Sequence, residues 1–284
     1  MKESSYLGFV LPTVIFLLVL TAMPIIATIF LSFTSFDIAH PERTTFIGLE
    51  NYKNLLFDNR FLNSVKVTLL LIIIPVAIQM IFGLSLAVAL NEKLKGTNWM
   101  RSVFLAPAIL PPVVIGLIWK VFLIPQLGGL NYFLSLVGIV GPDWLGSPTP
   151  ALWAVIIASI WTGTSFVALM YLSSLEAIPE SLYEAASIDG STWWQKLRFI
   201  TMPMLKSVSK VIMVFRVLEA LAIFPVVYVL TGGGPAGATE PINFYAYTVA
   251  FSYLRFDYSS TLIVVFFIFL LFVSLPILKS MVKR

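Results

Sequence analysis

Six long apolar segments dominate this sequence, and each is about as long as a helix that crosses a lipid bilayer. Such a helix needs about 20 mostly apolar residues. Hydrophobic residues make up 59% of the 284-residue chain and charged residues only 11%, too little polar surface to coat a water-soluble globule. We therefore expect an all-α membrane protein with about six transmembrane helices. The segments are residues 7–31, 65–90, 103–123, 151–172, 208–230 and 261–278.

Composition also argues against several kinds of chemistry. The chain has no cysteine and one histidine, His40, so it offers no thiolate nucleophile and no credible structural zinc site. No Ser/His pair, metal-ligand cluster or paired aspartates lie inside the apolar segments. Basic residues are spread between the segments, so the net charge of +4 does not indicate a nucleic-acid partner. We expect one transmembrane domain over residues 1–284, with no catalytic residue and no metal site.

The connections between the segments predict an orientation. Cytoplasmic loops collect Lys and Arg. If the connections alternate between the two sides, eleven basic residues fall on one side and six on the other, with Arg216 inside the fifth segment. We therefore expect both termini in the cytoplasm. The richer side holds Lys2, Lys93, Lys95, Arg101, Lys196, Arg198, Lys206, Lys210, Lys279, Lys283 and Arg284.

The polar connection at residues 176–203, on the richer side, is typical of two short helices joined at a glycine. Pro179 suits the first helical position, and Gly190 suits the left-handed residue just past the first helix. Thr192 followed by Gln195 fits a capping box that begins the second helix.

One face of the first short helix is almost without side chains. Ala185 and Ala186 lie there, beside the carboxylate of Glu184. A helix of this kind has little to bury within its own chain, so we expect it to dock into a groove on a partner.

The spacing around this helix resembles a known signature. Glu184-Ala-Ala, three residues, Gly190, nine residues and Ile200-Thr-Met-Pro203 resemble the EAA motif, E-A-A-x3-G-x9-I-x-L-P, of permease subunits in binding-protein-dependent ABC importers, with Met202 in place of Leu. The resemblance implies that 176–203 is a cytoplasmic coupling segment that contacts an ATPase. Its expected coupling residues are Glu184, Ala185, Ala186, Asp189, Gly190 and Pro203.

Two further stretches resemble carbohydrate permeases of the maltose and glycerol-phosphate type: Phe46-Ile-Gly-Leu-Glu-Asn-Tyr52 and Tyr228-Val-Leu-Thr-Gly-Gly-Gly-Pro235. The resemblance implies a type I ABC importer fold in a bacterial or archaeal inner membrane. It also implies a sugar or polyol substrate, an external binding protein, two ATPase subunits and a second permease subunit, with a different chain favoured over a second copy. The sequence contains no Walker motif, so ATP and Mg²⁺ would be used by the ATPase and this chain would bind no cofactor.

Arg216 and Glu219 lie three residues apart within the fifth segment. Charges at this depth cost several kcal/mol unless they face protein or water. Two roles stay open: fixing helix packing or a gate, or hydrogen bonding to a polar solute. A competing hypothesis is an ion-coupled secondary transporter in which this pair takes part in coupling. The family resemblance places the solute pathway at Thr162, Gly163, Phe166, Arg216, Glu219, Ala220 and Ile223.

Overall fold

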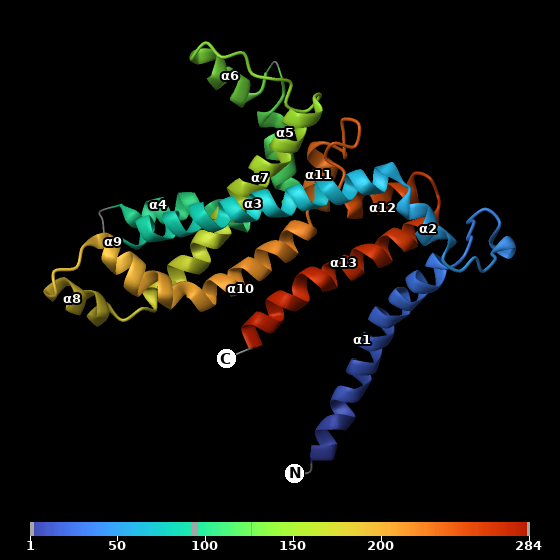
Figure 1. Cartoon of the computed structure of the whole chain (residues 1–284), viewed down its shortest axis with the longest axis horizontal. Coiled ribbons are helices and arrows are strands. Elements are labelled where there is room, and N and C mark those ends of the chain that lie inside the picture. The colour runs from blue at the N-terminus through green and yellow to red at the C-terminus, as the bar shows by residue number, and fades with distance from the viewer. Residues whose placement is uncertain (1–2, 93–95, 126, 283–284) are drawn as a thin grey trace. The chain divides into compact units, whose positions relative to one another are not determined.

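The computed structural model describes residues 3–92, 96–125 and 127–282 and is shown in Figure 1. Regular structure in these ranges is helical, apart from one isolated antiparallel bridge between Thr34 and Phe46. The all-α prediction is therefore confirmed. Packing divides the described chain into two compact units, one of residues 3–62 and 242–271 and the other of residues 63–241 and 272–282.

In the first unit, two residues of the 46–52 motif form hydrogen bonds with the C-terminal end of α1 (Glu3–Ser32). The buried amide of Asn51 donates hydrogen bonds to the carbonyl oxygens of Ser32 (3.3 Å) and Thr34 (3.0 Å), and the Tyr52 hydroxyl lies 2.7 Å from Ser32 Oγ. The last carbonyl groups of a helix lack partners within it, so Asn51 satisfies groups that burial would otherwise leave unpaired. This unit contains α1 (Glu3–Ser32), η1 (Pro41–Arg43), α2 (Glu50–Leu56), α12 (Ile242–Phe251) and the first part of α13 (Phe256–Val282).

Asp58 joins the first residues of α3 to two other helices of the same unit. Its Oδ1 accepts hydrogen bonds from the backbone N–H groups of Arg60 and Phe61, at the start of α3 (Asn59–Asn91). Its Oδ2 accepts hydrogen bonds from the hydroxyls of Tyr245 on α12 (2.6 Å) and Tyr258 on α13 (2.8 Å). Burial raises the pKa of the Asp58 carboxyl, but these four hydrogen bonds more than offset it, so the pKa lies below its ordinary value.

The second unit is built around α3, α7 and α10. Its core includes Leu90, Tyr171, Leu175, Leu205 and Ile212, all buried. Besides most of α3, this unit contains α4 (Thr97–Leu105), η2 (Ala106–Ile109), α5 (Pro112–Phe122), α6 (Gly129–Leu136), α7 (Pro148–Glu176), α8 (Glu180–Ile188), α9 (Trp193–Lys196), η3 (Leu197–Thr201), α10 (Met202–Leu221) and α11 (Phe224–Leu230).

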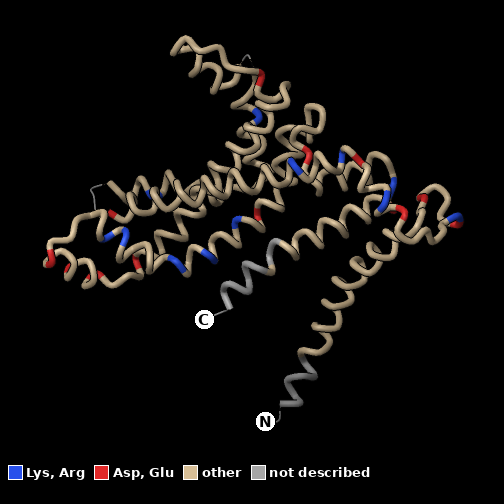
Figure 2. The backbone as a smooth tube through the Cα atoms, in the orientation of Figure 1, with Lys and Arg blue, Asp and Glu red and all other residues tan. Residues whose placement is uncertain are grey.

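Three described helices are long and apolar enough to cross a membrane: Val10–Ser32, Asn59–Asn91 and Pro148–Glu176. Figure 2 shows their long uncharged stretches. The number rises to five if each of two bent helix pairs forms one span. The described apolar part of the last helix, Phe256–Phe272, is shorter, so the count of six stays a prediction.

The expected third span, residues 103–123, is not one straight helix. Its two parts, Thr97–Ile109 and Pro112–Phe122, meet at an angle of 105°. Pro111 has an extended backbone and Pro112 begins α5, because proline lacks the N–H that would continue the preceding helix. The helix that contains most of the expected fifth span, residues 208–230, begins well before that span: a continuous helix runs over Trp193–Leu221 and bends by 45° before α11.

Orientation across the membrane stays a prediction. Several of the basic residues behind it lie outside the described ranges. They are Lys2, Lys93, Lys95, Lys283 and Arg284.

Candidate functional site

The short helix α8 ends where the sequence predicts and begins one residue later. Pro179 is the capping residue before the helix rather than its first residue, because its ψ of 127° is extended. At the other end, Gly190 has φ +75°. Its N–H donates to the carbonyl of Ser187 and the N–H of Ser191 donates to that of Ala186, the Schellman pattern. Glycine is favoured at Gly190 because a Cβ is strained at positive φ.

The predicted capping box is confirmed. Thr192 Oγ1 accepts the backbone N–H of Gln195, and Gln195 Oε1 accepts that of Thr192 at 2.7 Å. The second helix of the segment is not separate, however. It passes through the π-helical turn η3 directly into α10, so the expected short helix is the beginning of the fifth long helix.

No residue of α8 is buried within this chain, so the predicted docking on a partner stays a prediction. Glu184 and Ala185 are exposed and Ala186 is half-buried. The apolar side chains of Ile188 and Trp194 are 88% and 71% exposed. Asp189 caps α8, and Pro203 is exposed in the first turn of α10. Figure 1 shows α8 and α9 at the end of the second unit where α3 finishes.

Within the second unit, Arg216 is buried in a polar network. Its Nε donates a 3.0 Å hydrogen bond to Oε1 of Gln79 on α3, and its guanidinium lies 5.7 Å from the ring centroid of Phe166 on α7. The Gln79 amide in turn donates to the carbonyl oxygen of Ser159 on α7 at 2.8 Å. Arg216 also pairs with Glu219, which lies three residues further along the same helix. The side chain of Arg216 is 3% exposed and that of Glu219 is 60% exposed.

Gly163 makes room for this network. A Cβ atom on Gly163 would collide with the Gln79 amide and the Arg216 guanidinium. The structure thus brings together Gly163, Phe166, Arg216 and Glu219 of the predicted pathway set.

The other three members of the predicted pathway set are Thr162, Ala220 and Ile223. Thr162 donates to carbonyl oxygens of its own helix, at 3.2 Å to Ala158 and 3.3 Å to Ser159. Ala220 and Ile223 are buried by the chain itself. Their place on a solute pathway stays a prediction.

The sequence did not single out three residues that the structure places in the Arg216 network or beside α8: Gln79, Tyr183 and Thr201. Gln79 carries a signal, since it is a lone amide inside an apolar run. Tyr183 and Thr201 carry none, because their 2.9 Å hydroxyl contact depends on how α8 folds back toward α10. In the described ranges, no group of three or more His, Cys, Asp or Glu side chains is placed to hold a metal ion.

Comparison with known proteins decides the family. Residues 79–284 match the family described as the binding-protein-dependent transport system inner membrane component. The chain belongs to this family. It is 36% identical over 285 residues to the trehalose/maltose transport system permease protein MalF of Thermococcus litoralis, a match covering 99% of this chain and 95% of that protein. It is 35% identical to the sulfoquinovosyl glycerol transport system permease protein SmoG of Agrobacterium fabrum, covering 90% and 83%.

Solved structures agree on the fold. A crystal structure of a bacterial ABC transporter that imports the acidic polysaccharide alginate matches with a TM-score of 0.85 at 24% sequence identity, covering 99% of this chain and 97% of that one. A crystal structure of a bacterial alginate ABC transporter in complex with an alginate pentasaccharide-bound periplasmic protein matches with a TM-score of 0.81 at 24% identity, covering 98% of this chain and 93% of that one. The described helices therefore have the fold of type I ABC importer permeases.

This ABC importer permease is thus an inner-membrane component of a binding-protein-dependent transport system. Family membership does not favour the competing hypothesis of an ion-coupled secondary transporter. The same family match identifies the chain as a membrane component of the transport system.

Proposed function

We propose that this permease forms part of the translocation pathway for a sugar or related polyol delivered by an external binding protein. The names of relatives that carry trehalose, maltose or sulfoquinovosyl glycerol support a carbohydrate substrate. ATP and Mg²⁺ are used by two separate ATPase subunits. A second permease, a different chain, completes the pathway, and both termini of this chain lie in the cytoplasm.

The observation that carries the proposal is the exposure of α8. A nine-residue helix with no buried residue has almost no packing of its own. The Schellman turn at Gly190 gives its C-terminal end a defined shape. Its exposed residues offer a partner the carboxylate of Glu184, the small side chain of Ala185 and the apolar side chain of Ile188. These features support a socket on the ATPase as its binding partner.

The pathway itself lies along α7 and α10 in this proposal. Supporting it, Phe166 on α7 and the Arg216–Glu219 pair on α10 lie together, and the exposed Glu219 carboxylate is available to a polar solute. Aromatic faces beside hydrogen-bonding groups suit carbohydrate recognition.

Copurification tests the coupling role. Glu184→Arg reverses the charge of the proposed socket contact, so we expect the ATPase to be lost from the purified complex and ATP-driven uptake to cease. Glu42→Arg is the matched control, because it reverses an exposed carboxylate in η1, outside the coupling segment. Retention of the ATPase and of uptake in Glu184→Arg would refute the proposal, as would uptake that follows an ion gradient and persists without ATP.

A further inference from the structure

Two side-chain hydrogen bonds connect α8 to the chain that follows it. The hydroxyl of Tyr183 lies 2.9 Å from Oγ1 of Thr201, and Lys196 Nζ donates to Ser187 Oγ at 2.6 Å. Because no residue of α8 is buried, these polar contacts matter more for the position of α8 than they would for a helix held by a buried apolar face.

Thr201 is well placed to receive a movement of α8. It is 5% exposed and is the last residue of the π-helical turn η3, directly before α10 begins at Met202. Its hydroxyl lies 2.9 Å from the Tyr183 hydroxyl and 3.4 Å from the carbonyl oxygen of Lys196, so it is in hydrogen-bonding reach of both α8 and the turn that precedes it. Single π-helical turns are often found at functional sites within longer helices.

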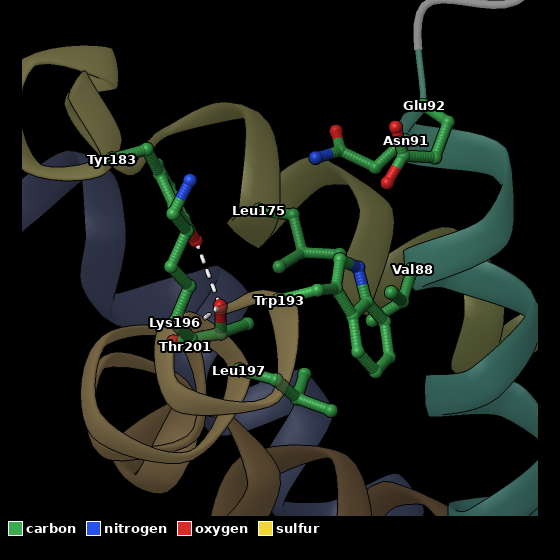
Figure 3. A pocket seen from close by; sticks show the side chains of 9 residues that line it. All are labelled: Val88, Asn91, Glu92, Leu175, Tyr183, Trp193, Lys196, Leu197 and Thr201. Carbon is green, nitrogen blue, oxygen red and sulfur yellow. Dashed lines mark hydrogen bonds between the residues drawn. The ribbon is translucent and has the colours of Figure 1, made fainter. Parts of the chain in front are cut away.

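Tyr183 also borders two cavities. One has a volume of about 360 Å³ and is lined by Tyr183, Trp193, Lys196 and Thr201 with the ends of α3 and α7, as Figure 3 shows. The other, of about 640 Å³, is lined by Tyr183, Glu180 and Pro179 with the same ends of α3 and α7. Tightly packed side chains resist displacement, whereas open volume beside Tyr183 leaves α8 room to shift.

We propose that Tyr183 is a positioning residue that carries the movement of α8 to the start of α10 through its hydrogen bond to Thr201. The inference rests on the proposed coupling role of α8. α10 carries Arg216 and Glu219, so this bond links the ATPase-facing helix to the helix of the proposed solute pathway. Losing the bond should leave the ATPase attached but let ATP hydrolysis run without a matching amount of uptake.

The test is the ratio of sugar taken up to ATP hydrolysed. The complete importer, with its second permease, ATPase and binding protein, is reconstituted in proteoliposomes and supplied with labelled maltose and labelled trehalose. Tyr183→Phe and Thr201→Val each remove one hydroxyl with little change of shape. We expect each to lower the ratio about fivefold, the factor that corresponds to the loss of one hydrogen bond. The double variant should be no worse than either single variant.

Two controls separate transmission from general damage. Thr201→Ser keeps the hydroxyl and should keep the wild-type ratio, and Tyr132→Phe removes the hydroxyl of an exposed tyrosine on α6 and should also leave the ratio unchanged. A wild-type ratio in Tyr183→Phe, or losses that multiply in the double variant, would overturn the inference. Absence of a copurified ATPase in the wild type would instead refute the proposed function.

Discussion

The buried guanidinium of Arg216 on α10 is held by the buried amide of Gln79 on α3, with 3.0 Å between Nε and Oε1. Glu219 pairs with the same guanidinium, and the ring of Phe166 lies against it. The Nε and one terminal nitrogen of Arg216 are therefore hydrogen-bonded within the chain. Of the two roles left open by the sequence, this geometry favours the fixing of helix packing for Arg216 and leaves Glu219 as the more accessible group.

Replacing Gln79 should destabilise the second unit. Gln79→Leu leaves the buried Nε of Arg216 without its acceptor, and a lost hydrogen bond to a charged group costs about 1.5–3 kcal/mol. We expect a lower thermal unfolding midpoint for the purified permease complex in detergent. Gln79→Glu restores an acceptor with a charge opposite to that of Arg216, so it should lose less stability at neutral pH. Equal midpoints for Gln79→Leu and the wild type would contradict the importance of this contact.

Adding a methyl group at Gly163 should also destabilise the second unit, because it would crowd the Gln79–Arg216 contact from α7. In Gly163→Ala the new Cβ meets both the Gln79 amide and the Arg216 guanidinium, and overpacking of this kind costs about 1–3 kcal/mol. The expected result is a lower unfolding midpoint and reduced uptake at a normal amount of protein in the membrane. Ser173→Ala, an exposed change on the same helix, is the control and should behave as the wild type. A fully stable Gly163→Ala would show that the network can move aside.

The stability contributed by Asp58 should depend on pH. The pKa of Asp58 is lower in the folded protein, so its contribution is present above the ordinary value of 3.8 and is lost as pH falls through the folded pKa. At pH 7 we expect Asp58→Asn to unfold at a lower temperature than the wild type, by an amount that corresponds to about 1–3 kcal/mol. The two proteins should converge only once the pH has fallen below the pKa of folded Asp58, which itself lies below 3.8. Asp37→Asn, at an exposed turn that accepts a hydrogen bond from the Ala39 N–H, should change little; a difference for Asp58→Asn that persists unchanged into acid would count against this account.

Backbone shape at the end of α8 should matter for ATPase attachment. Gly190→Ala places a Cβ at φ +75°, which costs about 1–2 kcal/mol for most residues. We expect less ATPase to copurify, by several-fold, because the Schellman turn that fixes the end of α8 is weakened. Gly190→Asn should be milder, since asparagine tolerates the left-handed region. Equal ATPase yields from Gly190→Ala and the wild type would mean that this turn does not set the docking geometry.

Sequence reasoning succeeded where the determining interactions are local. The left-handed Gly190 and the Thr192–Gln195 capping box each depend on residues a few positions apart, and both are present. The Arg216–Gln79 contact joins residues 137 positions apart, so it depends on how α3 and α10 pack. No periodicity or capping rule predicts such a pairing.

Prolines explain why the third apolar segment, expected as one straight helix, is bent in the structure. The 105° break at Pro111 and Pro112 divides a segment whose hydropathy alone indicates one span. Hydropathy measures only whether a segment suits lipid, whereas the angle between its halves depends on backbone geometry.

The exposed apolar side chains in and beside α8 should affect how long a chain without its partner subunits survives in the cell. Three large apolar side chains within the coupling segment are exposed: Ile188, Trp194 and Phe199, the last of them 69% exposed. If the proposed ATPase contact covers this apolar surface, a copy in a complete importer would hide it, whereas a copy synthesised in excess of its partners would expose it to chaperones and proteases. Balanced production of the subunits should therefore govern how much of this permease persists in a cell.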